Sequence, residues 1–414
     1  MRKILHPYRQ ISEAVINLVL ADVFLQIINA AFTLLLNFLM LDAGFRDFEI
    51  TSMAGNRYLT VLLCSMPLAI FVKGKRLKPI MLAGSVSAPV VALLLILAVH
   101  LKNTELIRLL MAVWGVAFSL LQILVMPYIL LNGKKQSETA SIALFFAAGN
   151  FTIIICGLFN YVLPKLHPFF NVEHLLVLYS VIGAMGIYFV MKLPHHENLG
   201  SRIPLRNFHE DYDWPIIFKA LVPTFLIAFG AGFTIPFINL FFKNVHNIGS
   251  QGFSLMNTVA FMLVAFGSIL IPEIKNRYGY KWSITVFQVM AIGVLFALGT
   301  TEWYKDWRWA GWLAAFFFIV RQPLMSIAAP MTSELTMNYV GENNREMISA
   351  ITAAIWSGSW FASAKIFAIL RESDIAYSNI IFITVVLYII GVAWYYWLIT
   401  DYEKQVAENR GQLL

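Results

Sequence analysis

Twelve apolar runs, each about twenty residues long, recur along the chain. A helix of that length crosses the ~30 Å hydrocarbon core of a bilayer, and a window of about 19 residues detects such runs. We therefore predict an all-α integral membrane protein. Its membrane-spanning helices are expected at 14–41, 47–72, 79–100, 105–131, 139–163, 173–193, 216–242, 250–272, 282–300, 309–336, 346–370 and 376–400.

The composition excludes a water-soluble alternative. The sequence is 59% hydrophobic and only 13% charged, whereas an average soluble domain carries roughly 25% charged residues. A single soluble core stops growing at roughly 250–300 residues, so this chain would expose large apolar patches to water. Lipid must take the place of water around most of it.

The basic residues indicate the orientation of the chain in the membrane. Most of the 30 Lys and Arg lie in the N-terminal segment, in the loops after even-numbered spans, and in the C-terminal tail. Short loops rich in Lys and Arg stay in the cytoplasm. We therefore expect a multi-pass protein of the bacterial inner (plasma) membrane with both termini cytoplasmic. Orientation also explains the net charge of +7 without nucleic-acid binding.

The longest polar segment, 193–215, is predicted to be a cytoplasmic connector between an N-terminal half, 1–192, and a C-terminal half, 216–414. His195 and His196 in this segment are more typical of a solvated loop than of a metal site, because no further ligands stand at zinc-like spacing.

The two halves carry an internal repeat. The segment 24–39 of the first span aligns with 225–240 of the seventh at a constant offset, matching a Phe-Leu pair, an Ala and a Phe-Thr pair. Many transporters are built from fused repeats that hold the substrate site between them. The repeat therefore predicts two related six-helix halves.

A basic turn follows both the second and the eighth span. In each turn, glycine comes seven residues after a proline and basic residues lie beside it. Glycine allows a tight reversal of the backbone, and the basic side chains meet anionic headgroups. The residues concerned are Gly74, Lys75 and Arg76 in the first turn, and Arg277, Gly279 and Lys281 in the second.

With twelve spans in two sets of six, a polar central loop and these glycine turns, the sequence resembles the major facilitator superfamily. The placement of Arg108 near the start of the fourth span is also similar to that of an arginine common in the family. The Gly-Pro pattern of drug/proton antiporters is absent from the fifth span. The resemblance implies a monomeric secondary transporter that opens a midplane cavity to each side in turn, with a small-molecule substrate and no cofactor.

Charged and polar side chains within spans mark candidate functional positions, because a charge at a helix centre in the membrane costs at least ~2.5 kcal/mol. Asp22, Gln26 and Asn29 share one face of the first span. Arg57 lies about ten residues into the second span, or ~15 Å along the helix. Arg321 lies near the middle of the tenth span and is too deep to reach the surface easily. We predict that the substrate contacts Gln26, Asn29, Arg57 and Arg321. Asp22 is either the proton carrier or a structural counter-ion of Arg321.

Other positions leave two interpretations open. Asn239 lies in a seventh span whose glycines and proline permit bending, and Trp356 lies in a stripe of small polar residues in the eleventh. Both are predicted substrate contacts, although such stripes also pack helices together. Arg57 and Arg108 either line a cavity or extend toward the outer surface.

Three intramembrane arginines against one aspartate favour an anionic, carboxylate-bearing substrate, moved with a coupling proton. Efflux of hydrophobic or cationic compounds is the alternative within transport. A membrane-embedded enzyme should bring His, Cys or carboxylate groups together near one face, and a sensor should carry a soluble domain; the sequence has neither pattern. We expect no enzyme activity and no metal site. No glycine-rich nucleotide-binding loop is present.

Overall fold

The computed structural model describes the chain except for residues 1–10, 73–74, 133–137, 195–212, 342–344 and 412–414. Gly74, His195, His196 and most of the predicted connector lie outside the described residues. Every regular element in the described part is helical, which confirms the all-α prediction.

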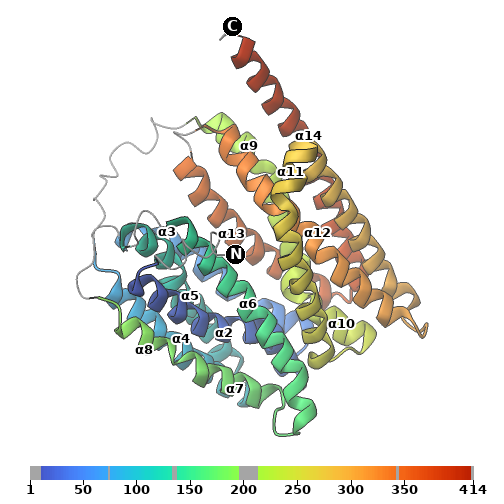
Figure 1. The fold of residues 1–414 in the computed structure, drawn as a ribbon. Coiled ribbons are helices and arrows are strands. Elements are labelled where there is room, and N and C mark those ends of the chain that lie inside the picture. Colours follow the sequence, from blue (N-terminus) through green and yellow to red (C-terminus); the bar gives the residue numbers. More distant parts are fainter. Residues whose placement is uncertain (1–10, 73–74, 133–137, 195–212, 342–344, 412–414) are drawn as a thin grey trace. The chain divides into compact units, whose positions relative to one another are not determined.

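One compact unit consists of Met1–Pro204 together with Gly249–Thr258. Each of the first five predicted spans corresponds to one helix, and the sixth corresponds to two (Figure 1). The helices are α2 (Glu13–Asp42), α3 (Asp47–Val72), α4 (Lys78–His100), α5 (Thr104–Asn132), α6 (Glu138–Leu166), α7 (Val172–Gly183) and α8 (Gly186–Met191).

The second compact unit consists of Leu205–Ile248 and Val259–Leu414. The first turns of α11 belong to the first unit. The elements of the second unit are α9 (Trp214–Thr234), η3 (Ile235–Phe237), α10 (Ile238–His246), α11 (Ser250–Thr300), η4 (Thr301–Tyr304), α12 (Ala310–Tyr339), α13 (Arg345–Glu372) and α14 (Tyr377–Gly411).

The helices have the length and surface of membrane spans. Within the described ranges, eleven are long and apolar enough to cross a bilayer, and α3, with 26 residues, supplies the twelfth. On α4 the exposed apolar side chains recur at helical spacing, which places them in one stripe along the helix. These are Val86, Val90, Leu93, Leu94 and Leu97. A stripe of this kind is favourable in contact with lipid and unfavourable in water.

The internal repeat is visible in the helix packing. In the first unit α2 packs against α6 and α7, and in the second unit α9 packs against α13 and α14. The first helix of each unit therefore contacts the helices that correspond to the fifth and sixth spans of its own half. Figure 1 shows these helices side by side within each unit.

Two of the predicted spans break where glycine or proline allows it. The seventh predicted span becomes α9, the 3₁₀ turn η3 and α10, with Pro236 inside the turn. The sixth breaks between α7 and α8, where a Cβ on Gly183 would lie 2.2 Å from Cγ1 of Ile28. Small residues at this break therefore let α7 approach the backbone of α2 closely.

The predicted turn between the eighth and ninth spans is shorter than expected. Helical geometry continues from Ser250 to Thr300 and is interrupted at Gly279, with φ 69° and ψ −180°. This backbone conformation is accessible essentially only to glycine. Gly279 therefore provides the change of direction that the basic turn requires.

Gly279→Ala is expected to destabilise the protein by ~1–3 kcal/mol, because alanine cannot adopt this conformation without strain. The melting temperature of the purified protein in detergent would show the loss. Gly293→Ala is the matched control, since Gly293 lies on the same helix with no atom within 4 Å of an added Cβ and no positive φ. Equal melting temperatures for the two variants would contradict the prediction.

Candidate functional site

Four side chains from α2 and α3 form one hydrogen-bonded row, which we call the polar row. The Nε2 of Gln26 donates to Oδ1 of Asp22 at 3.5 Å, and the Nδ2 of Asn29 donates to Oε1 of Gln26 at 3.1 Å. The guanidinium of Arg57 then donates to Oδ1 of Asn29 at 2.8 Å. Residues at i, i+4 and i+7 share one helix face, so α2 presents its three polar groups together and α3 adds the arginine.

The two ends of the polar row differ in exposure. Asp22 is only 2% exposed, whereas Arg57 is half-buried. The buried end therefore holds a carboxylate whose one described hydrogen bond comes from Gln26. The other end holds the guanidinium of Arg57.

Arg57 also lies against two aromatic rings of α5, Trp114 and Phe118, which we call the aromatic pair. The guanidinium carbon is 5.8 Å from each ring centroid, and the two rings stack at 5.1 Å. An arginine over aromatic faces is held by cation–π attraction and keeps its hydrogen-bonding edge available. The indole Nε1 of Trp114 is buried with no hydrogen-bond partner among the described residues.

A glycine brings the aromatic pair to Arg57. A Cβ on Gly115 would lie 2.6 Å from the backbone oxygen of Arg57 and 3.2 Å from Cβ of Thr60. Only glycine therefore lets α5 approach α3 at this level. The neighbouring Trp114 reaches the guanidinium because of that close approach.

Arg321 on α12 occupies a different setting, within the second unit. Its side chain is 4% exposed, and a guanidinium nitrogen donates to the hydroxyl of Tyr388 on α14 at 3.5 Å. Its Nε is buried and has no partner in the described part of the chain. Tyr388 in turn packs on Gly230 of α9, where an added Cβ would lie 2.9 Å from the ring.

Neither Arg57 nor Arg321 has a carboxylate partner among the described residues. The ion pairs seen in the described residues include His100–Glu173, Arg108–Glu105 and Lys219–Asp401, and none involves Arg57 or Arg321. A buried or half-buried cation without a counter-charge is costly. An anionic group that reached either arginine would therefore be bound favourably, and the planar guanidinium matches a carboxylate or phosphate.

Two other predicted substrate contacts have partners of their own. Asn239 is 2% exposed and its Oδ1 accepts from the backbone N–H of Leu240 at 3.0 Å. Trp356 is 37% exposed and packs edge-on against Trp360 at 6.2 Å. The contacts of Arg321 include neither residue. Asn239 supports the start of α10, and Trp356 presents part of its ring outward.

Arg108 is separate from the polar row. Its side chain is 46% exposed and its guanidinium pairs with Glu105 at 2.7 Å, one turn away at the start of α5. Of the two interpretations of Arg108, lining a cavity or extending toward the surface, its exposure favours the second.

The basic turns expose most of their cations. Lys75 lies over the ring of Phe71, with Nζ 3.2 Å from the centroid, and Arg76 is exposed. In the second turn, Arg277 lies 5.5 Å from the ring of Tyr278. The ammonium of Lys281 is 4.4 Å from the ring of Tyr396 on α14.

The sequence did not single out Trp114, Phe118 or Tyr388 as site residues. Aromatic side chains in an apolar span are usually packing or lipid-facing residues, so their type carried no functional signal. The useful sign for Trp114 was its position beside Gly115 in the fourth span, where a glycine permits a close helix crossing.

Comparisons with known proteins agree with this architecture. The family model described as the Major Facilitator Superfamily matches residues 16–364. No curated protein matches the chain in sequence.

Several solved structures share the fold. A bacterial homologue of the human lysosomal transporter Spinster is 15% identical, with 95% of this chain and 97% of that chain covered and a TM-score of 0.67. The D-xylose–proton symporter is 11% identical, with 92% and 96% covered and a TM-score of 0.72. The nucleoside transporter NupG is 14% identical, with 93% and 99% covered and a TM-score of 0.69.

The family match spans most of the chain, and the membrane spans of the described residues, the two units and the repeated packing all agree with it. The chain is a multi-pass integral membrane protein with the architecture of a secondary transporter, and it belongs to the Major Facilitator Superfamily.

Proposed function

We propose that this protein moves a small organic anion, bearing a carboxylate or a similar group, across the membrane by alternating access. The observation that carries this proposal is the pair of intramembrane arginines that lack a carboxylate partner among the described residues. Arg57 combines a half-buried guanidinium, a fixed orientation from Asn29 and an aromatic backing. These three features together favour an anionic group attached to an organic body over a bare inorganic ion.

Proton coupling is the second part of the proposal. Asp22 is the acidic end of the polar row, and Gln26 and Asn29 link it to Arg57 by hydrogen bonds. Binding of an anion at Arg57 draws the guanidinium away from Asn29 and so rearranges the hydrogen bonds that reach Asp22. Protonation of Asp22 would balance the charge of the incoming anion. The similar D-xylose–proton symporter, as its name states, moves its sugar with a proton.

The proposed working unit is a monomer in the bacterial inner membrane with both termini in the cytoplasm. The distribution of Lys and Arg supports this orientation. The halves 1–192 and 216–414, joined by 193–215, would move against each other during the cycle. The division of the chain into two compact units supports that movement.

A ligand screen by thermal stability tests the substrate class. A ligand that binds only the folded state stabilises it by about 2.7 kcal/mol at 100 times its Kd. Organic anions are expected to raise the melting temperature of the wild-type protein in detergent. Arg57→Ala should abolish that increase, and Arg108→Ala, which changes an exposed arginine, should retain it.

The outcome of the screen also separates the two transport hypotheses. Stabilisation by lipophilic cations alone would overturn the anion proposal and favour efflux of cationic compounds. Stabilisation by anions that persists in Arg57→Ala would remove Arg57 from the binding site.

A further inference from the structure

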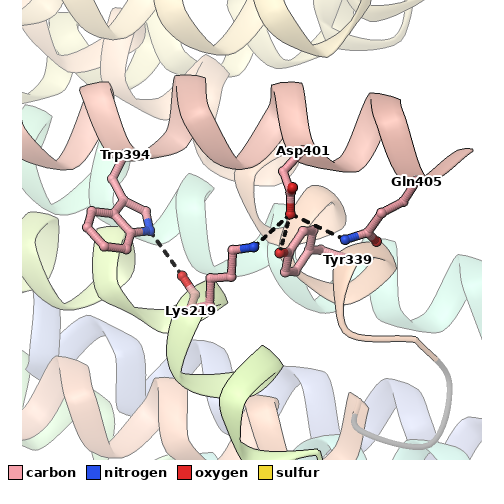
Figure 2. A network of polar contacts seen from close by, with 5 residues as sticks. All are labelled: Lys219, Tyr339, Trp394, Asp401 and Gln405. Atoms are coloured by element: carbon pink, nitrogen blue, oxygen red, sulfur yellow. Dashed lines mark hydrogen bonds and ion pairs between the residues drawn. The ribbon is translucent and has the colours of Figure 1, made fainter. Parts of the chain in front are cut away.

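A second polar network lies within the second unit and involves none of the predicted site residues. Asp401 on α14 accepts three hydrogen bonds at one carboxylate oxygen, Oδ2 (Figure 2). The donors are Nζ of Lys219 at 2.8 Å, the hydroxyl of Tyr339 at 2.7 Å and Nε2 of Gln405 at 3.3 Å. Because Lys219 is on α9 and Tyr339 is on α12, one side chain of α14 connects three helices.

The surroundings of Lys219 fix it in this position. Its ammonium lies 4.4 Å from the ring centroid of Trp397 and 5.6 Å from that of Tyr339. Its backbone oxygen accepts from Nε1 of Trp394 at 3.1 Å, as Figure 2 shows. The side chains of Lys219 and Asp401 are 31% and 29% exposed. An isolated ion pair with this exposure contributes little to stability. Here three donors share one carboxylate oxygen and aromatic rings lie beside the ammonium, so the network as a whole constrains the positions of the three helices.

The network acts on a helix that is weakened in its interior. Tyr339 is the last residue of α12, and Pro323 and Pro330 lie inside that helix. Each proline removes a backbone hydrogen bond. The turns beyond Pro330 are therefore joined less firmly to the part that carries Arg321, and side-chain contacts must hold them in place.

Arg321 and the network lie on the same side of α12. Arg321 and Tyr339 are 18 residues apart, which is about five helical turns, and both contact α14, at Tyr388 and Asp401. The helix is thus fastened to α14 on either side of its two prolines. Release of the Asp401 contact would free the end of α12 while leaving the contact of Arg321 with Tyr388 intact.

We propose that Asp401, with Lys219 and Tyr339, positions the end of α12 during the transport cycle and sets the rate of the conformational step. This inference rests on the proposed function for its effect on transport. We assign no substrate contact to these three residues, which act as positioning residues. Their loss changes the maximal rate and leaves substrate affinity nearly unaltered.

Three variants and a control test this proposal. Asp401→Asn removes the charge, Tyr339→Phe removes one hydroxyl, and Asp401→Glu keeps the carboxylate. Asp401→Asn and Tyr339→Phe are each expected to change the maximal uptake rate per folded transporter about tenfold, the factor for one hydrogen bond to a charged group. KM should stay within about twofold, because a side chain that makes no contact with the substrate contributes nothing to its binding. Asp401→Glu should restore most of the rate.

Glu403→Gln is the matched control, since Glu403 is an exposed carboxylate two residues farther along α14. It should leave rate and KM unchanged. A change in KM with an unchanged maximal rate for Asp401→Asn or Tyr339→Phe would overturn the positioning role.

Hydrogen–deuterium exchange provides a readout that needs no substrate. Asp401→Asn and Tyr339→Phe should both speed exchange within 331–339, and Asp401→Glu should restore protection there. Unchanged exchange in this segment would overturn the proposal even if the protein transports an anion. If no anion binds, the proposed function fails. Faster exchange within 331–339 that Asp401→Glu reverses would even then support the role of the network in holding the end of α12.

Discussion

Arg321→Met is expected to abolish uptake of the transported anion while the melting temperature of the protein stays the same or rises. Removing the charged partner of a bound anion costs about 2–5 kcal/mol, which corresponds to at least about a 30-fold loss of uptake. The stability of the folded protein is not expected to fall with uptake. Arg321 is 4% exposed with no described carboxylate partner, and an apolar side chain of similar volume in place of a buried charge is often neutral or stabilising.

Measuring uptake and melting temperature together distinguishes an arginine that binds substrate from one that only supports the fold. If Arg321 served only to hold α12 against α14, its loss would lower the melting temperature. The contact with Tyr388 is long, at 3.5 Å, so Arg321→Met/Tyr388→Phe should remove any cost of the unpaired hydroxyl. Arg108→Met changes an exposed, ion-paired arginine and should leave both uptake and stability unchanged. A stable Arg321→Met protein with normal uptake would exclude this residue from the substrate site.

The fold was largely predictable because lipid imposes a simple rule on sequence. A spanning helix must satisfy its backbone internally and present apolar side chains over its whole length, so the twelve runs are visible without any tertiary information. The details that the sequence could not supply concern packing. Helical geometry continues through the turn before Gly279, and the first turns of α11 belong to the first unit. Neither fact depends on local composition.

The site was predictable only where its residues share one helix. The 3.6-residue period places Asp22, Gln26 and Asn29 on one face, and the structure joins them by hydrogen bonds. Partners on other helices were not visible, because nothing in the sequence of α5 states which helix Trp114 faces. The network at Asp401 was missed for the same reason, since its residues come from three helices that are far apart in the sequence.

Asp22→Asn is expected to abolish accumulation of the anion driven by a pH gradient and to preserve exchange of external for internal substrate. Asparagine has nearly the shape of aspartate and its Oδ1 still accepts from Gln26, so the polar row can form. What disappears is the group that gains and loses a proton. With one proton per anion, a gradient of one pH unit supports about tenfold accumulation, and the variant should reach only equal concentrations on both sides.

Exchange provides the internal control because it requires substrate binding and the conformational change but no net proton movement. An Asp22→Asn protein that loses exchange as well would indicate that Asp22 supports the binding geometry of Arg57. A variant that still concentrates the anion would assign the coupling proton to another group. Glu13→Gln, which changes an exposed carboxylate in the first turn of the same helix, should accumulate substrate normally. The position of Asp22 at the buried end of the polar row makes these outcomes distinct, since anion binding at Arg57 and proton binding at Asp22 are then separate events linked only through Gln26 and Asn29.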